Sequence, residues 1–259
     1  MTITITTRAA TTVMDTSANA AKFYAVGVGP GDPELMTRKA ARVLAEVDRI
    51  YSASSRAGEP GIARRIVDGL GLSSEKFRTV PVPMSRNRGG ARSAYRLAAA
   101  EIVQDLELGR SAAWIVEGDP LLYGTSIYVL EEVARLRPGS RTEVVPGVTS
   151  VQAAAARAGI ELARLGEGVA ICPAAYGLDH LPETLKRFAT VCLLKVNTTF
   201  DRLLDRLEAL PGPLSAVYLE RVGMPGERVV TDLASLRGQD LPYFSMVLIR
   251  AGRSGDADE

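Results

Sequence analysis

The chain contains few of the residues on which metal and nucleophilic chemistry usually depend. Its 259 residues include one histidine, His180, and two cysteines, Cys172 and Cys192. One histidine and two dispersed cysteines cannot form a usual zinc site. We therefore expect no metal site, although a magnesium site made only of carboxylates stays open without a motif that indicates one. No serine turn lies near His180, which disfavours Ser–His and Cys–His hydrolases.

Other absences narrow the class of protein further. No stretch approaches the roughly 20 apolar residues of a membrane helix, and 31 Lys+Arg against 30 Asp+Glu argue against a general nucleic-acid binder. No P-loop is present, which disfavours a kinase. Residues 1–22 are rich in Thr and Ala without the apolar core of a signal peptide, so we expect a disordered N-terminal extension. Both cysteines lie in apolar runs, as buried thiols do, and we expect a cytoplasmic protein with no disulfide.

Apolar runs and helical patterns alternate along the chain, which predicts an α/β fold. We expect two α/β domains, residues 23–145 and 146–252, that meet at Pro146-Gly147, and a polar tail at 253–259. Strands are expected at 23–28, 49–52, 79–83, 111–116, 142–145, 169–172, 191–196, 215–219 and 243–250. Helices are expected after Pro33 and at 62–70, 92–108, 126–136, 151–158, 181–188 and 200–210.

Two loops of similar design follow predicted strands. Gly27–Pro33 follows the first strand, and Glu117–Pro120 follows the apolar run 112–116. Glycine permits close approach of backbone and ligand, and the carboxyl ends of strands in one sheet form a ligand crevice. The alternatives are a tight turn for the first loop and a capped helix start for the second. The first loop begins like a dinucleotide fingerprint, but Asp32 stands where its third glycine is required.

Positive charge is concentrated in one segment of this nearly neutral chain. Lys76 to Arg96 contains six cations and no acidic residue, with Gly89-Gly90 near its middle. Such a segment is either a clamp for a ligand with several carboxylates or a solvated loop. Glu220-Arg221 and Asn197 follow two further predicted strands, where they line a crevice or form ordinary turns.

Taken in order, the motifs resemble the tetrapyrrole methylase family of cobalamin and sirohaem biosynthesis. The matching segments span about residues 23 to 250 and are Gly27–Leu35, Glu117–Thr125, Val144–Ser150 and Glu220–Gly223. Three more segments resemble the members that methylate carbon 20 of precorrin-2: Val82–Arg86, Leu193–Asn197 and Leu241–Ser245. One departure is Gly124, which stands where the family usually has serine.

The resemblance implies two α/β domains with a ligand cleft between them, S-adenosylmethionine as methyl donor, a tetrapyrrole polycarboxylate as substrate and a homodimer. The charge balance and the lack of a long apolar run noted above predict no partnership with nucleic acid or membrane. The implied cofactor contacts are Pro30, Glu117, Gly118, Asp119, Thr125, Thr149, Ser150, Lys195, Tyr243 and Phe244. Gly29, Gly31 and Asp32 are implied on the substrate side, and Arg86, Arg88 and Arg92 are the arginines expected to clamp the carboxylates.

The reaction implied is attack by a bridging carbon of precorrin-2 on the sulfonium methyl group. Alignment alone can supply roughly 7 to 11 kcal/mol of such a barrier, so no strong catalytic side chain is required. Asp32, Asp119 and Tyr123 are candidate bases by location only. Three alternatives stay open: methylation of the cobalt form or of another ring carbon, a non-catalytic nucleotide-binding protein, and a Rossmann dehydrogenase.

Overall fold

The computed structural model describes residues 21–56, 58–83, 88–211 and 213–251, which form two compact units. Unit 1 contains the chain up to Gly29 and Pro33–Gly147, and unit 2 contains Pro30–Asp32 and the chain from Val148 onward. The predicted tail at 253–259 and most of the predicted extension at 1–22 lie outside the described residues. Lys22 is described, and its amide donates to Ser111 Oγ at 3.1 Å, so ordered chain begins before the first strand.

The sheet of unit 1 consists of five parallel strands in the order β3-β2-β4-β1-β5. Its strands are β1 (Phe23–Gly27), β2 (Arg49–Ser54), β3 (Phe77–Pro81), β4 (Ala112–Val116) and β5 (Thr142–Val145). Its helices are α1 (Arg38–Glu46), α2 (Ile62–Val67), α3 (Arg88–Glu107) and α4 (Ser126–Leu136). Parallel strands need such crossover helices, which bury both faces of the sheet.

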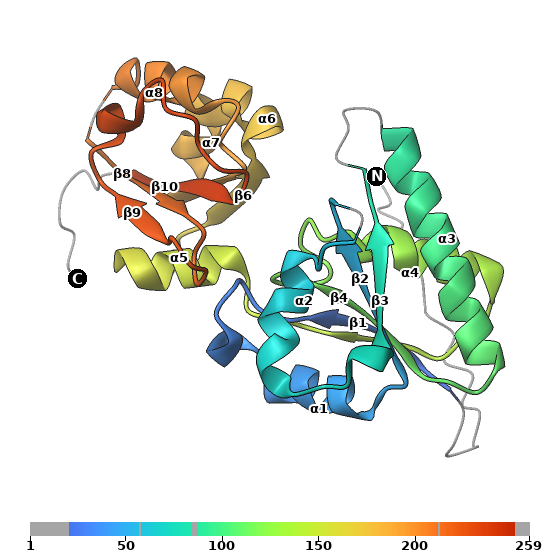
Figure 1. The fold of residues 1–259 in the computed structure, drawn as a ribbon. Coiled ribbons are helices and arrows are strands. Elements are labelled where there is room, and N and C mark those ends of the chain that lie inside the picture. The colour runs from blue at the N-terminus through green and yellow to red at the C-terminus, as the bar shows by residue number, and fades with distance from the viewer. Residues whose placement is uncertain (1–20, 57, 84–87, 212, 252–259) are drawn as a thin grey trace, which may run out of the picture. The chain divides into compact units, whose positions relative to one another are not determined.

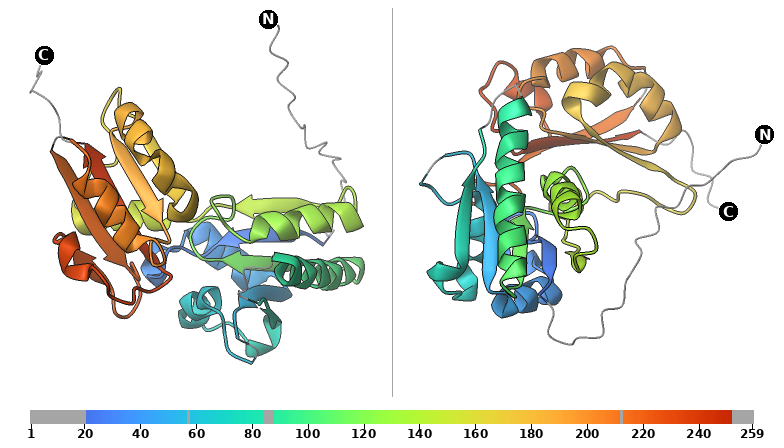
Figure 2. Two further views of the ribbon diagram at one scale, coloured as in Figure 1. Left: turned by 90° about the horizontal axis from the view of Figure 1, so that it is seen from above. Right: turned by 90° about the vertical axis from the view of Figure 1, so that its right-hand side faces the viewer.

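Helices cover both faces of this sheet (Figures 1 and 2). Alternate residues of its central strand β4 belong to two different cores. Trp114 and Val116 belong to the core shared with α3 and α4. Ala113 and Ile115 belong to the core shared with α1 and α2. From β1 the chain passes through α1 to β2, whereas from β4 it passes through α4 to β5 on the other side of β1. The neighbours β1 and β4 therefore form a topological switch point, where open parallel sheets bind ligands.

The sheet of unit 2 is mixed, in the order β6-β7-β10-β8-β9, and only the pair β6–β7 is parallel. Its strands are β6 (Val169–Pro173), β7 (Thr190–Leu194), β8 (Leu214–Glu220), β9 (Arg228–Val230) and β10 (Ser245–Ala251). Its helices are α5 (Ser150–Ala158), α6 (Ala174–Gly177), α7 (Leu181–Arg187) and α8 (Phe200–Glu208). Figure 1 shows α5 on one face of this sheet and α6, α7 and α8 on the other.

The predicted α/β fold is confirmed, and several element boundaries differ. The predicted helix at 92–108 begins four residues earlier, at Arg88. The last strand begins at Ser245, so that Tyr243 and Phe244 precede it. The strand β9 and the short helix α6 were not predicted. Three residues are too few to show an alternating pattern, and four are too few to show a helical one.

The single histidine and the two cysteines all lie in unit 2. His180 is exposed, as a solvated loop residue is. Cys192 is buried and Cys172 half-buried, and both thiols are free. Burial raises the pKa of the Cys192 thiol to about 12, because the interior disfavours the thiolate. Across the described ranges, none of the helices has the length and apolarity to cross a bilayer.

Candidate functional site

At the switch point of unit 1, the backbone after β1, β4 and β5 comes into direct contact. The Gly118 amide donates to the Gly29 carbonyl oxygen at 2.7 Å. A Cβ built on Gly27 would lie 2.4 Å from the Gly118 oxygen, and one on Gly147 would lie 2.1 Å from the same atom. Both distances are shorter than real Cβ contacts. Glycine is therefore required here by packing, beyond the conformational freedom anticipated from the sequence.

Asp119 links two of these loops through its carboxylate. Its Oδ1 accepts the Leu121 amide at 2.8 Å, and its Oδ2 accepts the Gly147 amide at 3.1 Å. Charge-assisted bonds of this kind are among the stronger hydrogen bonds in proteins. Because both oxygens accept backbone amides, the geometry favours a positioning role for Asp119 over proton transfer.

Glu117 and Thr125 lie at the starts of two helices of unit 1. Glu117 Oε1 accepts the Ala63 amide at 3.2 Å, in the first turn of α2, whose N-cap residue Gly61 has no side chain to do so. A carboxylate is favourable at a helix N-terminus. Thr125 is the N-cap residue of α4, and its side chain makes no capping bond. The Glu117 carboxylate therefore holds the start of α2 close to the end of β4. The Thr125 hydroxyl is not used to cap α4.

The segment after β5 leads into unit 2 through a complete capping box. Thr149 Oγ1 accepts the Gln152 amide at 3.3 Å, and the Gln152 side chain accepts the Thr149 amide at 3.0 Å. Two amides at the start of α5 are thereby satisfied, and Thr149 is its N-cap residue. The Thr149 hydroxyl is committed to the cap, and Ser150 becomes the first residue of α5.

The first-loop segment Pro30–Asp32 packs within unit 2 against the turn after β8. A Cβ on Gly31 would lie 2.5 Å from Met224 Cγ, and one on Gly223 would lie 2.7 Å from the Asp32 amide nitrogen. Gly31 and Asp32, which were predicted to face the substrate, therefore contact the turn Glu220–Gly223, which was predicted to line a crevice.

Arg157, in the last turn of α5, forms ion pairs with both sides of the contact between the first loop and the turn after β8. Its guanidinium lies 3.8 Å from Asp32 Oδ2 and 3.2 Å from Glu227 Oε1, and Glu227 Oε2 accepts the Gly223 amide. Sequence reasoning missed Arg157. A cation in the last turn of a helix is ordinary by itself, and only the fold brings it to two distant carboxylates.

Lys195, Arg221, Tyr243 and Phe244 meet at one edge of the unit 2 sheet. The Lys195 amide donates to the Ser245 carbonyl at 2.7 Å, and the Arg221 amide donates to the Phe244 carbonyl at 2.8 Å. Lys195 Nζ lies 5.0 Å from the centre of the Tyr243 ring. Three of these residues were predicted as cofactor contacts, and Arg221 joins them.

A buried polar network lies under Arg221. The Tyr218 hydroxyl donates to Glu220 Oε2, and Arg228 donates to the same oxygen at 3.1 Å. Burial raises the pKa of Tyr218 above its usual range, and its hydrogen bond to Glu220 raises it further. Glu220 also raises the pKa of Arg228. The residue before Arg221 is therefore anchored by two partners.

The described cations of segment 76–96 lie on different elements of unit 1, and the clamp stays a prediction. Lys76 lies before β3, where its Nζ donates to the Ala45 carbonyl at 2.6 Å, and Arg96 pairs with Glu132 at 3.3 Å. Arg92 is exposed on α3, near the carboxyl edge of the sheet, where that helix begins. Arg86 lies outside the described residues, and Arg88 is the first residue of α3.

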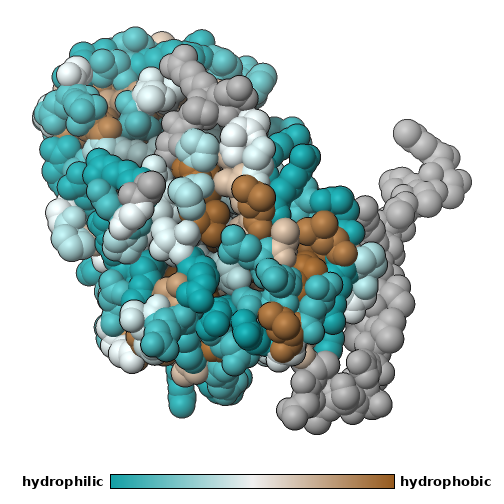
Figure 3. Space-filling model, turned by 45° about the vertical axis from the view of Figure 1, so that its right-hand side comes forward, coloured by the Kyte–Doolittle hydropathy of each residue, from teal (hydrophilic) through white to brown (hydrophobic). Residues whose placement is uncertain are grey.

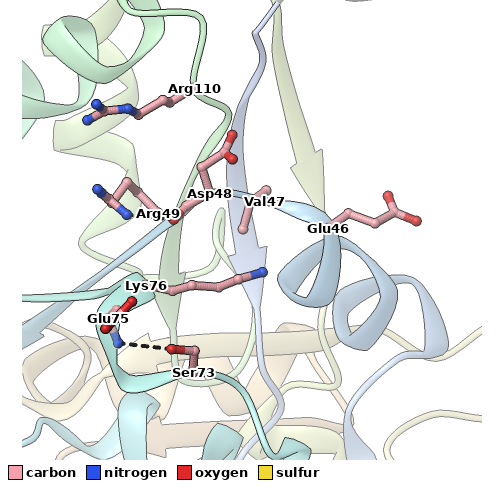
Figure 4. A pocket seen from close by; sticks show the side chains of 8 residues that line it. All are labelled: Glu46, Val47, Asp48, Arg49, Ser73, Glu75, Lys76 and Arg110. Carbon is pink, nitrogen blue, oxygen red and sulfur yellow. Dashed lines mark hydrogen bonds between the residues drawn. The ribbon is translucent and has the colours of Figure 1, made fainter.

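A hollow of about 380 Å³ lies in unit 1 before β2, β3 and β4, away from the switch point (Figure 4). Its lining residues are Glu46, Val47, Asp48, Arg49, Ser73, Glu75, Lys76 and Arg110. Asp48 Oδ2 accepts the Ser111 amide at 2.8 Å, so part of this polar surface holds the starts of the strands together. In the described ranges, no three of the His, Cys, Asp and Glu side chains are grouped to hold a metal ion.

Comparisons with known proteins agree with this arrangement. The chain is 33% identical over 231 residues to a cobalt-precorrin-2 C(20)-methyltransferase of Salmonella typhimurium, covering 88% of this chain and 95% of that protein. It is 29% identical to a precorrin-2 C(20)-methyltransferase of Sinorhizobium sp, over 88% and 94%.

A solved structure supports the fold. It is the uroporphyrin-III C-methyl transferase of Thermus thermophilus complexed with S-adenosylhomocysteine, with a TM-score of 0.64, 22% identity and coverage of 89% of this chain and 97% of that one. The family model of the tetrapyrrole (corrin/porphyrin) methylases matches residues 22–237. The chain is therefore a member of the tetrapyrrole methylase family.

Proposed function

We propose that the protein is an S-adenosylmethionine-dependent methyltransferase that methylates carbon 20 of precorrin-2, giving precorrin-3A, in cobalamin biosynthesis. The observation that carries this proposal is the agreement of two relatives that cover 88% of the chain and share the C(20)-methyltransferase name. One relative is named for the cobalt substrate and the other for the metal-free one. Both forms of precorrin-2 are therefore candidates for this chain.

The residues at the strand ends fit a ligand with hydroxyl and amino-acid groups. In unit 1, three close-packed glycines keep side chains away from the ends of β1 and β4, and the Thr125 hydroxyl caps no amide. We assign Glu117, Gly118, Asp119 and Thr125 to the cofactor, with Pro30, Thr149 and Ser150 contributed by unit 2. When bound, S-adenosylmethionine would supply a methyl group activated by its sulfonium sulfur.

The chain's own residues then have to align the substrate with the methyl group and assist the loss of one proton. Asp32 lies next to Gly31, with its Oδ2 3.8 Å from the Arg157 guanidinium. Asp119 is occupied by two amides, so Asp32 and Tyr123 are the better candidates to assist loss of the proton from the methylated carbon. Arg86, Arg88 and Arg92 stay our candidates for the substrate carboxylates.

The test is an anaerobic incubation of the protein and S-adenosylmethionine with precorrin-2 or with its cobalt form, followed by mass spectrometry. One added methyl group on one substrate supports the proposal and decides between the two forms. An unmodified tetrapyrrole in both reactions, with S-adenosylmethionine still bound, would instead favour another ring system or a non-catalytic binder.

The homodimer and the cytoplasmic location stay predictions. Exposed apolar side chains occur on neighbouring helices of unit 1, where Leu97 of α3 and Tyr128 of α4 are both exposed. The face in Figure 3 is mainly hydrophilic, with several hydrophobic spots near its middle. Light scattering of the purified protein, together with a Leu97→Glu variant, tests whether a dimer forms through this surface.

A further inference from the structure

Three residues other than glycine have a left-handed backbone among those that the structure describes. They are Tyr123 (φ 54°), Lys195 (φ 59°) and Arg221 (φ 51°). A side chain in this region costs of order 1 kcal/mol or more, and such residues cluster at functional sites. Lys195 and Arg221 both lie in unit 2 at the ends of strands β7 and β8.

The two cations flank the same short segment of chain. Strand β10 lies between β7 and β8. The Lys195 amide donates to the carbonyl of Ser245, the first residue of β10, and the Arg221 amide donates to the carbonyl of Phe244, the residue before it. Since neighbouring strands lie about 4.8 Å apart, the two backbones are separated by roughly 10 Å. Both side chains are exposed, and the nearest carboxylate in sequence, Glu220, is buried against Tyr218 and Arg228.

Two aromatic rings belong to the segment that the two cationic residues contact. Tyr243 and Phe244 are 39% and 37% exposed, with ring centres 5.1 Å apart and planes at 88°. Exposed aromatic rings beside cations form a surface that suits a ligand with an apolar body and anionic arms. Glycine would adopt this backbone conformation without strain, so the presence of Lys and Arg at both strained positions is consistent with a use for their side chains.

We propose that Lys195 and Arg221 bind two carboxylate groups of the tetrapyrrole, with Tyr243 and Phe244 packing against its apolar part. This inference rests on the proposed function and gives it a second anion-binding element in addition to the arginines proposed above. It also moves Lys195 from the cofactor to the substrate. S-adenosylmethionine has a single carboxylate, whereas two cations on backbones roughly 10 Å apart match two acidic arms of one polycarboxylate.

The test uses Arg221→Gly, Lys195→Gly and the double variant, because glycine removes each cation and relieves the strained φ. Arg187→Ala, an exposed arginine of α7 in the same unit, is the matched control. We expect a melting temperature equal to or above that of wild type and a KM for the tetrapyrrole raised about tenfold per variant. The kcat and the Kd for S-adenosylmethionine should stay within twofold, and Arg221→Lys should restore most of the affinity.

The opposite results are equally clear. A KM for the tetrapyrrole within twofold of wild type in the double variant overturns the inference. A raised Kd for S-adenosylmethionine with an unchanged KM for the tetrapyrrole also overturns it, because that result would assign the cations to the cofactor's carboxylate. If wild type methylates neither form of precorrin-2, the proposed function fails separately. Binding of uroporphyrin, an octacarboxylate, measured by fluorescence then decides: tighter binding to wild type than to the double variant supports the inference, and equal or absent binding overturns it.

Discussion

The strand ends of unit 1 and those of unit 2 are built in opposite ways. In unit 1 the strand ends form a backbone edge, in which main-chain atoms pack against one another. The Gly118 amide donates to the Gly29 carbonyl, and Gly27 and Gly147 have no room for a Cβ. In unit 2 the edge is formed by side chains, with Lys195 and Arg221 held in a left-handed conformation. A backbone edge presents amides and carbonyls, whereas a side-chain edge presents charge and rings.

The contrast predicts different consequences of mutation. Substitutions at the backbone edge should act first on folding and only thereby on binding, because an added atom has no space. Substitutions at the side-chain edge should act on ligand affinity, because the strained residues are not needed for packing. The predictions below measure this difference from its largest expected effect to its smallest.

Gly147→Ala should have the largest effect. Its Cβ would lie 2.1 Å from the Gly118 oxygen, so the loops after β4 and β5 must separate. We expect a loss of at least about 3 kcal/mol in the free energy of unfolding, measured with urea. Gly69→Ala is the control, since a Cβ there meets nothing within 4 Å. Equal stability of the two variants would contradict the backbone edge.

Asp119→Ala should come next, because it leaves the Leu121 and Gly147 amides without their acceptor. We expect a loss of about 2 kcal/mol in stability and a parallel loss of affinity for S-adenosylmethionine, measured by calorimetry. Asp119→Asn retains one acceptor oxygen and should lie between wild type and Asp119→Ala. A fully stable Asp119→Ala variant with normal affinity would remove Asp119 from the edge.

The sequence predicted nine of the ten strands that the structure describes and the two loops after β1 and β4, because each depends on residues close together in the chain. It did not predict that Pro30–Asp32 packs with unit 2, since this depends on Gly31 meeting the distant Met224. Nor did the spacing of Asp119 indicate that the Gly147 amide is its partner. Such contacts follow from the closing of the sheet and have no local signal.

Tyr218→Phe tests the anchor under the side-chain edge. Loss of the hydroxyl leaves Glu220 with Arg228 as its partner, and we expect about 1 kcal/mol less stability with a smaller rise in KM than for Arg221→Gly. Because burial raises the pKa of Tyr218, the difference from wild type should not change between pH 6 and 9. A stability difference that varies over this interval would contradict a neutral, hydrogen-bonded hydroxyl.

Glu143→Gln should have the smallest effect and a defined pH dependence. Hydrogen bonds from Lys22 and then Lys39 lower the pKa of this half-buried carboxyl. A lowered folded-state pKa means that the stabilisation is present above the unfolded pKa and is lost as the pH falls through the folded one. We expect the free energy of unfolding at pH 7 to lie below that of wild type by well under 1 kcal/mol, and this difference to shrink as the pH falls below the pKa of an unfolded glutamate. A difference that stays constant as the pH falls would point to packing instead of charge.

The most direct test of the proposed function is methyl transfer from S-adenosylmethionine labelled with ¹³C in its methyl group, with precorrin-2 and its cobalt form as substrates under anaerobic conditions. NMR of the product locates the labelled carbon. A single labelled methyl on carbon 20 is the result we predict. A labelled methyl on any other ring carbon, or an unlabelled tetrapyrrole in both reactions, would contradict the assignment.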